Sequence, residues 1–233
     1  MEIKIIASGS TGNATKISDG ATSLILDAGI TIKRLLSGTG FTVSDAAGCF
    51  ITHEHLDHAC AMKPVANLGV NIYASKGTFD AHKVSGHRYH EIKSLESVTL
   101  GTFEVMAFDT VHDAAEPLGF LIESKLTGEK VVYFSDTSYI KYTFKGITHL
   151  IVECNHGERE LRQSVRDGII EADLAKRIAK NHMSVERLTE FLNALDRSRL
   201  KQINLIHLSD NNSNAERFKQ VIQRTTGAEV YVF

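Results

Sequence analysis

The sequence is short of cysteine and of net charge, and each shortage excludes a class of protein. It has 233 residues and only three cysteines, Cys49, Cys60 and Cys154. Three scattered cysteines cannot build the disulfide framework of a small secreted domain, so we expect a reducing, cytoplasmic environment. A formal net charge of -2 excludes a protein that coats nucleic acid nonspecifically, because such binding needs a large excess of Lys and Arg. A local basic patch is still compatible with this charge.

Membrane-spanning, signal and linker segments are missing as well. No apolar run approaches the roughly 20 residues of a transmembrane helix, and residues 1–7 alternate like a strand without the basic-then-apolar form of a signal peptide. Only two prolines occur, and no tract has low-complexity or linker composition. At this length, with 42% hydrophobic residues, we expect a single domain over residues 1–233 and no membrane partner.

Apolar periodicity predicts an α/β (α+β) fold with two sheets. Alternating or β-branched apolar runs between turn residues predict strands at 2–7, 13–18, 22–26, 48–52, 70–74, 102–108, 117–124, 130–134, 148–153, 203–206 and 228–233. Helical patterns occupy 30–37, 59–68, 157–180, 184–195 and 213–224. The first three strands should pair antiparallel. The order of elements fits two sheets packed face to face with helices outside.

The densest group of metal-binding residue types is His53-Glu54-His55-Leu56-Asp57-His58, directly after a predicted strand. Imidazole and carboxylate together suit zinc, manganese or iron, and spacings this short let one loop face two metals. The second His follows the first by two residues and not by the four of a zincin helix. A solvated polar loop is the alternative, but such a loop has no need of three histidines and an aspartate.

The order His-x-His-x-Asp-His resembles the signature of the metallo-β-lactamase superfamily, whose fold is a four-layer αββα sandwich. The resemblance implies two metal ions. By this resemblance His53 and His55 would bind one ion, and Asp57 and His58 would bind the other.

The same resemblance implies ligands at the ends of three later strands. His112 is similar to a lone ligand His of the family, Asp136 to its bridging Asp, and His207 to its last His. Asp27 matches an early Asp that orients the signature loop. Without the signature, His112 alone would be read as a structural histidine.

This ligand set predicts the type of reaction. Two neighbouring cations can bridge a hydroxide, lower its pKa and neutralise charge on an attacked phosphoryl group or carbonyl. A bridging Asp136 is typical of the phosphodiesterase branches, whereas the β-lactam branch has Cys at that place. We therefore predict a dinuclear phosphodiesterase in which a metal-bridging hydroxide attacks, with two divalent ions, zinc or manganese, and iron as an alternative.

Four short segments, 7–15, 153–156, 181–184 and 207–212, resemble the YycJ (WalJ) group of DNA exonucleases, relatives of the transfer-RNA processing nucleases. The resemblance implies a nuclease with a nucleic-acid substrate, DNA in preference to RNA. The 70 residues between Asp136 and His207 are too few for the large domain that the β-CASP nucleases insert there.

Glu153 and His182 resemble the paired Glu and His that the tRNase Z branch places beside its metals. We predict that His182, held by Glu153, protonates the leaving oxygen, and that Asp57, Glu153 and His182 are catalytic. Alternatively, His182 simply precedes a helix that is capped by Ser184.

Residues for substrate contact are less sharply indicated. We predict Ser10 and Asn13, because the Gly-rich loop 8–15 can bring backbone N–H groups near an anion, although an ordinary turn explains it equally well. We also predict Asn155, which lies in the YycJ-like segment 153–156. Six basic residues at near-helical spacing are either solvated helix faces or a guide for a nucleic-acid backbone: Arg159, Arg162, Arg166, Lys176, Arg177 and Lys180.

Two other functions stay open from the sequence. The same metal chemistry allows hydrolysis of small phosphodiesters, thioesters or lactones. A noncatalytic binding protein that keeps the fold is the second alternative, although such a protein has little reason to retain seven ligand residues.

Overall fold

The computed structural model describes residues 1–233, in which the chain divides into two units. The first unit comprises Met1–Asp109 and Ala114–Tyr133, and the second comprises Thr110–Asp113 and Phe134–Phe233. No helix is long and apolar enough to cross a bilayer.

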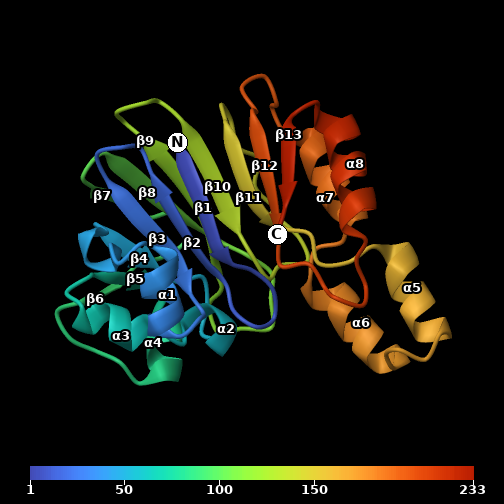
Figure 1. Ribbon diagram of the computed structural model, residues 1–233, viewed down its shortest axis with the longest axis horizontal. Coiled ribbons are helices and arrows are strands. Elements are labelled where there is room, and N and C mark those ends of the chain that lie inside the picture. The colour runs from blue at the N-terminus through green and yellow to red at the C-terminus, as the bar shows by residue number, and fades with distance from the viewer. The chain divides into compact units, whose positions relative to one another are not determined.

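A six-stranded sheet forms the centre of the first unit. Its strands lie in chain order: β1 (Glu2–Ala7), β2 (Ala14–Ser18), β3 (Ser23–Ala28), β4 (Gly48–Phe50), β5 (Ile72–Ala74) and β6 (Tyr89–Glu91) (Figure 1). The first three strands pair antiparallel as predicted, and β3 to β6 pair parallel. Because β3 and β4 are parallel neighbours, their carboxyl ends share one edge of the sheet, where Asp27 and Thr52 lie.

Helices cover the outer face of this sheet. They are α1 (Ile32–Gly38), α2 (Leu56–Ala59), α3 (Met62–Asn67) and α4 (Lys76–His82), and a 3-10 turn, η1, spans Val43–Asp45. Leu35, Val65 and Phe79 of these helices belong to one buried apolar cluster with Ile25 and Ile72 of the sheet. Strand β3 is buried along almost its whole length, which fits a strand covered on both faces.

The other face of the sheet packs on an antiparallel ladder in the same unit. Its strands are β7 (Ser97–Leu100), β8 (Phe103–Asp109), β9 (Leu118–Ser124) and β10 (Lys130–Phe134), paired in that order. The rings of Phe50 and Phe120 meet edge to face with centroids 5.2 Å apart. The first unit is therefore layered as helices, sheet and sheet.

Parallel strands form the centre of the second unit. β12 (Gln202–Ile206) lies between β11 (His149–Glu153) and β13 (Glu229–Val232). Helix α8 (Ala215–Thr226) packs on β13 and on α7 (Val185–Ala194), while α5 (Glu158–Arg166) and α6 (Ala172–Asn181) pack on each other (Figure 1).

The α/β class and the two sheets are confirmed, and the errors of prediction are local. The helix expected over 59–68 begins at Leu56 and is interrupted between α2 and α3. The helical pattern over 157–180 breaks after α5, where Gly168 adopts φ 69°, a conformation that ends a helix. Three short elements in polar sequence, α4, β6 and β7, were not predicted.

Candidate metal centre

The buried carboxylate of Asp27 organises the signature loop of the first unit. Its Oδ1 accepts the Thr52 N–H at 2.8 Å, and its Oδ2 lies 2.8 Å from His58 Nδ1 and 2.7 Å from the Tyr133 hydroxyl. Because a carboxylate only accepts, Nδ1 of His58 carries the proton and Nε2 has the lone pair. Asp27 thus contacts the loop as the resemblance implied, and it leaves His58 Nε2 with the lone pair that metal binding requires.

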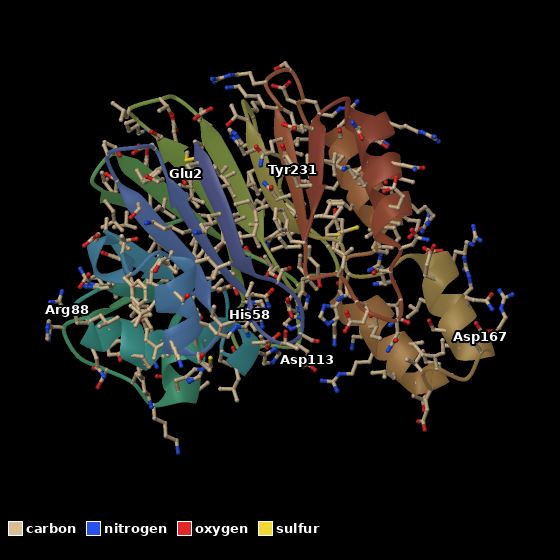
Figure 2. All side chains as sticks on the ribbon, viewed as in Figure 1. Glu2, His58, Arg88, Asp113, Asp167 and Tyr231 are labelled. Carbon is tan, nitrogen blue, oxygen red and sulfur yellow. The ribbon has the colours of Figure 1, made fainter.

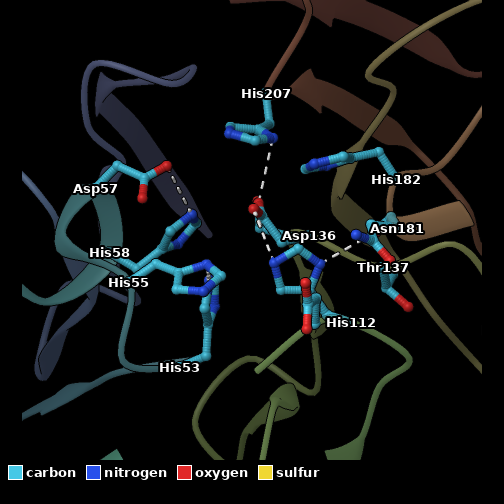
Figure 3. A network of polar contacts seen from close by, with 12 residues as sticks. His53, His55, Asp57, His58, His112, Asp136, Thr137, Asn181, His182 and His207 are labelled. Atoms are coloured by element: carbon cyan, nitrogen blue, oxygen red, sulfur yellow. Dashed lines mark hydrogen bonds and ion pairs between the residues drawn. The ribbon is translucent and has the colours of Figure 1, made fainter. Parts of the chain in front are cut away.

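The remaining signature residues lie beside this pair. Thr52 Oγ1 lies 3.0 Å from His53 Nδ1, and His53 Nε2 lies 3.0 Å from His55 Nδ1. Asp57 Oδ2 lies 3.5 Å from His58 Nε2, and a dashed line marks this contact in Figure 3. The first unit therefore presents three imidazoles and one carboxylate from one short loop.

Asn13, in the Gly-rich loop 8–15, contacts the signature loop. Its Oδ1 accepts the Gly9 N–H at 3.0 Å, and its Nδ2 lies 3.3 Å from the Asp57 carbonyl and 3.1 Å from His58 Nε2. The side chain is only 2% exposed, whereas Ser10 is exposed at the turn. The contacts of Asn13 therefore favour positioning of the ligand loop over direct contact with a substrate.

Three predicted ligands of the second unit, His112, Asp136 and His207, meet around the Asp136 carboxylate (Figure 3). Asp136 Oδ2 lies 3.6 Å from His112 Nε2, and Oδ1 lies 3.2 Å from His207 Nδ1. His112 Nδ1 donates to the Asn181 carbonyl at 3.2 Å, so its Nε2 also has the lone pair. Burial lowers the pKa of His112, although the charge of Asp136 opposes this shift. The lowered pKa favours the neutral imidazole, which is the form that binds metals.

Backbone strain accompanies these side chains. Asp27, Asp136 and His207 have φ values of 57°, 44° and 56°, in the left-handed region that residues other than glycine rarely adopt. Each lies at the carboxyl end of a strand. Such strain persists only where the surroundings enforce it, and it is concentrated at functional sites.

Glu153 is the centre of a second buried network in the same unit. Its Oε1 lies 2.6 Å from His182 Nδ1 and 3.0 Å from His207 Nδ1, and its Oε2 accepts the N–H groups of Thr137 and Met183 at 2.9 and 3.0 Å. Burial disfavours the charged carboxylate, but these donors, above all His182, lower the pKa of Glu153. It is therefore ionised at neutral pH.

His182 is the partly exposed member of this pair. Burial alone would lower its pKa, but the charge of Glu153 and their hydrogen bond outweigh it and raise the pKa above the ordinary value. Ser184 does cap α7, because its side chain accepts the Arg187 N–H at 3.2 Å. Both predicted features are present, and the cap does not explain the contact between His182 and Glu153.

Asn155 connects three segments of the second unit. Its Nδ2 donates to the His207 carbonyl at 3.0 Å, and its backbone bonds to the Met183 carbonyl and the Ser209 N–H. The residue is 8% exposed. Like Asn13, it holds predicted site residues in place.

The basic rows on α5 and α6 are all exposed, so the structure favours neither of their two interpretations. Arg162 lies 3.5 Å from Glu158, and Lys176 lies 2.9 Å from Asp173, both within one helix. Figure 2 shows the side chains of this region, with Asp167 labelled at the end of α5.

Three positioning residues escaped the sequence reasoning: Thr52, Tyr133 and Thr137. Thr52 immediately precedes the signature, which was a usable signal. Tyr133 reaches Asp27 across 106 residues of chain, and Thr137 reaches Glu153 across 16. Nothing in the local sequence marks those two contacts.

The donor chemistry fits divalent transition metals. In the second unit, donor atoms of Asp136, Glu153, His182 and His207 that could hold a metal ion lie within 4.8 Å of one another. In both units, histidines donate Nδ1–H to a carboxylate or carbonyl, an arrangement that fixes the tautomer of metal-binding histidines. Imidazole with carboxylate suits zinc, manganese and iron.

Comparison with known proteins agrees with this chemistry. A family model described as β-lactamase superfamily domain matches residues 22–208. The exodeoxyribonuclease YycJ of Bacillus anthracis is 29% identical over 228 residues, which cover 91% of this chain and 84% of that protein.

Solved structures show the same fold. The metallo-β-lactamase fold protein YhfI of Bacillus subtilis superposes with a TM-score of 0.75 at 18% identity, over 99% of this chain and 95% of its own. The short form of human tRNase Z superposes with a TM-score of 0.67 at 16% identity, over 100% of this chain and 96% of its own. Because the family match extends from β3 past the last predicted ligand, His207, the chain belongs to the β-lactamase superfamily and is a metal-dependent hydrolase of the metallo-β-lactamase fold.

Proposed function

We propose that the protein is a metal-dependent phosphodiesterase that cleaves nucleic acid, DNA in preference to RNA, as an exonuclease. The relatives support this substrate class, because the Bacillus anthracis protein is named an exodeoxyribonuclease and the human neighbour a tRNase. We also propose that the two units act as one domain and that the protein works in the cytoplasm.

Seven side chains are proposed as ligands of two divalent ions, with zinc or manganese as the metals: His53, His55, Asp57, His58, His112, Asp136 and His207. When bound, such ions lower the pKa of water and neutralise charge on a phosphodiester. The chain's own contribution is to hold the imidazoles in one tautomer, through Asp27 for His58 and Asn181 for His112.

The contact between Glu153 and His182 carries the proposal of phosphodiester cleavage. A departing DNA alkoxide is a strong base and needs a proton. His182 donates Nδ1–H to the buried Glu153, and its raised pKa increases the fraction that also carries a proton on Nε2. Glu153 therefore stabilises the imidazolium before the transfer, the Nε2 proton passes to the leaving oxygen, and the neutral imidazole that remains keeps its Nδ1–H bond to Glu153.

Among the predicted substrate-binding residues, Ser10 is proposed to contact the substrate, since it alone of the three is exposed. Asn13 and Asn155 are proposed to keep the ligand loops in place, because their side chains bond to the protein's own backbone.

Leaving groups of different basicity test the role of His182. His182→Ala should slow cleavage of single-stranded DNA by about a hundredfold or more, the usual scale for a general acid. Hydrolysis of bis-p-nitrophenyl phosphate should change little, because nitrophenolate departs without a proton. His87→Ala, which removes an exposed histidine, is the control. Equal reductions of the hydrolysis rate on both substrates, or loss of bound metal in His182→Ala, would refute the general-acid assignment.

A further inference from the structure

A pocket of about 300 Å³ lies in the second unit, between the loop 139–143 and α7. Its walls include three aromatic residues, Tyr139, Tyr142 and Phe191. The volume is at the lower end of the range for small-ligand sites, about 300–1,000 Å³. It has no part in the metal chemistry described above.

The aromatic walls are partly fixed and partly open. Phe191 packs edge to face on Phe134 with centroids 5.8 Å apart, and it also packs on Phe144 at 6.4 Å. Tyr139, in contrast, is 60% exposed. An exposed ring beside a fixed apolar wall is the arrangement on which nucleic-acid bases stack.

Charged groups surround these rings. Lys141 Nζ lies 5.2 Å from the centroid of the Tyr142 ring. Arg187 is held by its Nη1, which donates to the Ser138 and Ala179 carbonyls at 3.2 Å each, so other guanidinium N–H groups remain for a ligand. Two cations suit a phosphate, and the Glu190 carboxylate in the wall suits the amino group of a base.

Both walls of the pocket are anchored on Glu153, the carboxylate that holds His182. Thr137 Oγ1 bonds the Tyr139 carbonyl at 2.9 Å, and the Thr137 N–H donates to Glu153 Oε2 at 2.9 Å. The N–H of Met183, which also lines the pocket, donates to the same oxygen at 3.0 Å. The pocket is therefore held in a defined position relative to His182.

We propose that this pocket binds one nucleobase of the substrate, next to the phosphodiester that His182 serves. The base stacks on Tyr139, and Lys141 and Arg187 contact the adjoining phosphate. The proposal rests on the proposed nuclease function and deepens it by assigning a subsite for a single nucleotide.

The test combines variants of one ring with DNA that lacks one base. Tyr139→Ala removes the ring, Tyr139→Phe retains it, and Tyr231→Ala removes a ring of 41% exposure on β13 (Figure 2). Each is assayed on end-labelled single-stranded DNA, on a series with one abasic residue at successive positions, and on bis-p-nitrophenyl phosphate.

Tyr139→Ala should raise KM for intact DNA about tenfold, the scale of one base–aromatic stack, with a smaller change in kcat. Tyr139→Phe and Tyr231→Ala should behave like the wild type, and bis-p-nitrophenyl phosphate should be hydrolysed equally by all. One abasic position should raise KM in the wild type and cause no further loss in Tyr139→Ala, because the two changes remove the same contact.

Three results would overturn the subsite. An unchanged KM for Tyr139→Ala on DNA that the wild type cleaves would refute the proposed subsite and leave the nuclease proposal intact. If Tyr139→Ala hydrolysed DNA and bis-p-nitrophenyl phosphate with equally reduced kcat/KM, Tyr139 would act on the catalytic residues and not on a base. If the wild type hydrolysed bis-p-nitrophenyl phosphate but no oligonucleotide, the nuclease proposal would fail, and the subsite with it.

Discussion

The fully buried Asp27 Oδ2 lies 2.8 Å from Nδ1 of the equally buried His58, and this contact leaves the lone pair of the imidazole on His58 Nε2, the nitrogen proposed to bind a metal. Removal of the carboxylate charge should weaken metal binding although Asp27 is not among the proposed ligands. We expect Asp27→Asn to lower metal affinity about 10- to 100-fold, the usual effect of losing such a partner. Titration against a competing chelator measures it.

Tyr133→Phe is the graded control for that experiment. It removes only the hydroxyl that donates to Asp27 Oδ2 at 2.7 Å. The free energy of unfolding should fall by about 1 kcal/mol, as for one buried hydrogen bond, with little change in metal affinity. A loss of affinity as large as that of Asp27→Asn would contradict the assignment of the effect to the carboxylate charge, because Tyr133→Phe leaves that charge in place.

Asp136 should be required for metal occupancy as well as activity. Asp136→Ala removes the carboxylate that lies beside both His112 and His207, so elemental analysis should show loss of metal together with loss of hydrolysis. Because Asp136 has φ 44°, Asp136→Asn is the better-tolerated companion variant, since Asn adopts this conformation more readily than Ala. Full metal occupancy in both variants would disprove the bridging assignment. The control is Asp113→Ala, which removes an exposed carboxylate and should leave the protein metal-loaded.

Asp19 should make part of the stability depend on pH. It accepts hydrogen bonds from Ser124 and Thr102, each at 2.6 Å. Burial opposes ionisation, but these donors and two backbone N–H groups lower the pKa of Asp19 to about 2 from 3.8. Since the pKa is lower in the folded state, the stabilisation is complete above pH 4 and is lost as pH falls toward 2.

Urea unfolding of metal-free protein measures this effect. The wild type should be more stable than Asp19→Asn at pH 6, and the difference should shrink between pH 4 and pH 2. The exposed Asp45→Asn should show no such trend. A difference between wild type and Asp19→Asn that is independent of pH would contradict the assigned role of the carboxylate.

The candidate ligand residues could be named from the sequence, because the signature is local and the other candidates follow strongly apolar strands. His112, Asp136 and His207 each follow a strand whose existence was predicted correctly. Periodicity located these strand ends, but the choice of the three residues as ligands came from the resemblance to the family signature, because a lone histidine or aspartate after a strand has no metal-binding pattern of its own.

The supporting contacts were not predictable, because they join segments that only folding brings together. The bond from Tyr133 to Asp27 and the two backbone donors on Glu153 leave no local pattern. Asn13 and Asn155 were predicted to contact substrate, since polar residues in site loops suggest it, yet their burial is a property of tertiary packing.

The most direct test of the central claim is the rate at which metal-loaded protein shortens end-labelled single-stranded DNA, measured beside nitrocefin and a thioester. We predict loss of nucleotides from an end, abolition by a chelator, recovery with zinc or manganese, and little turnover of nitrocefin. Turnover of nitrocefin or the thioester far faster than of any oligonucleotide would contradict the proposed substrate class.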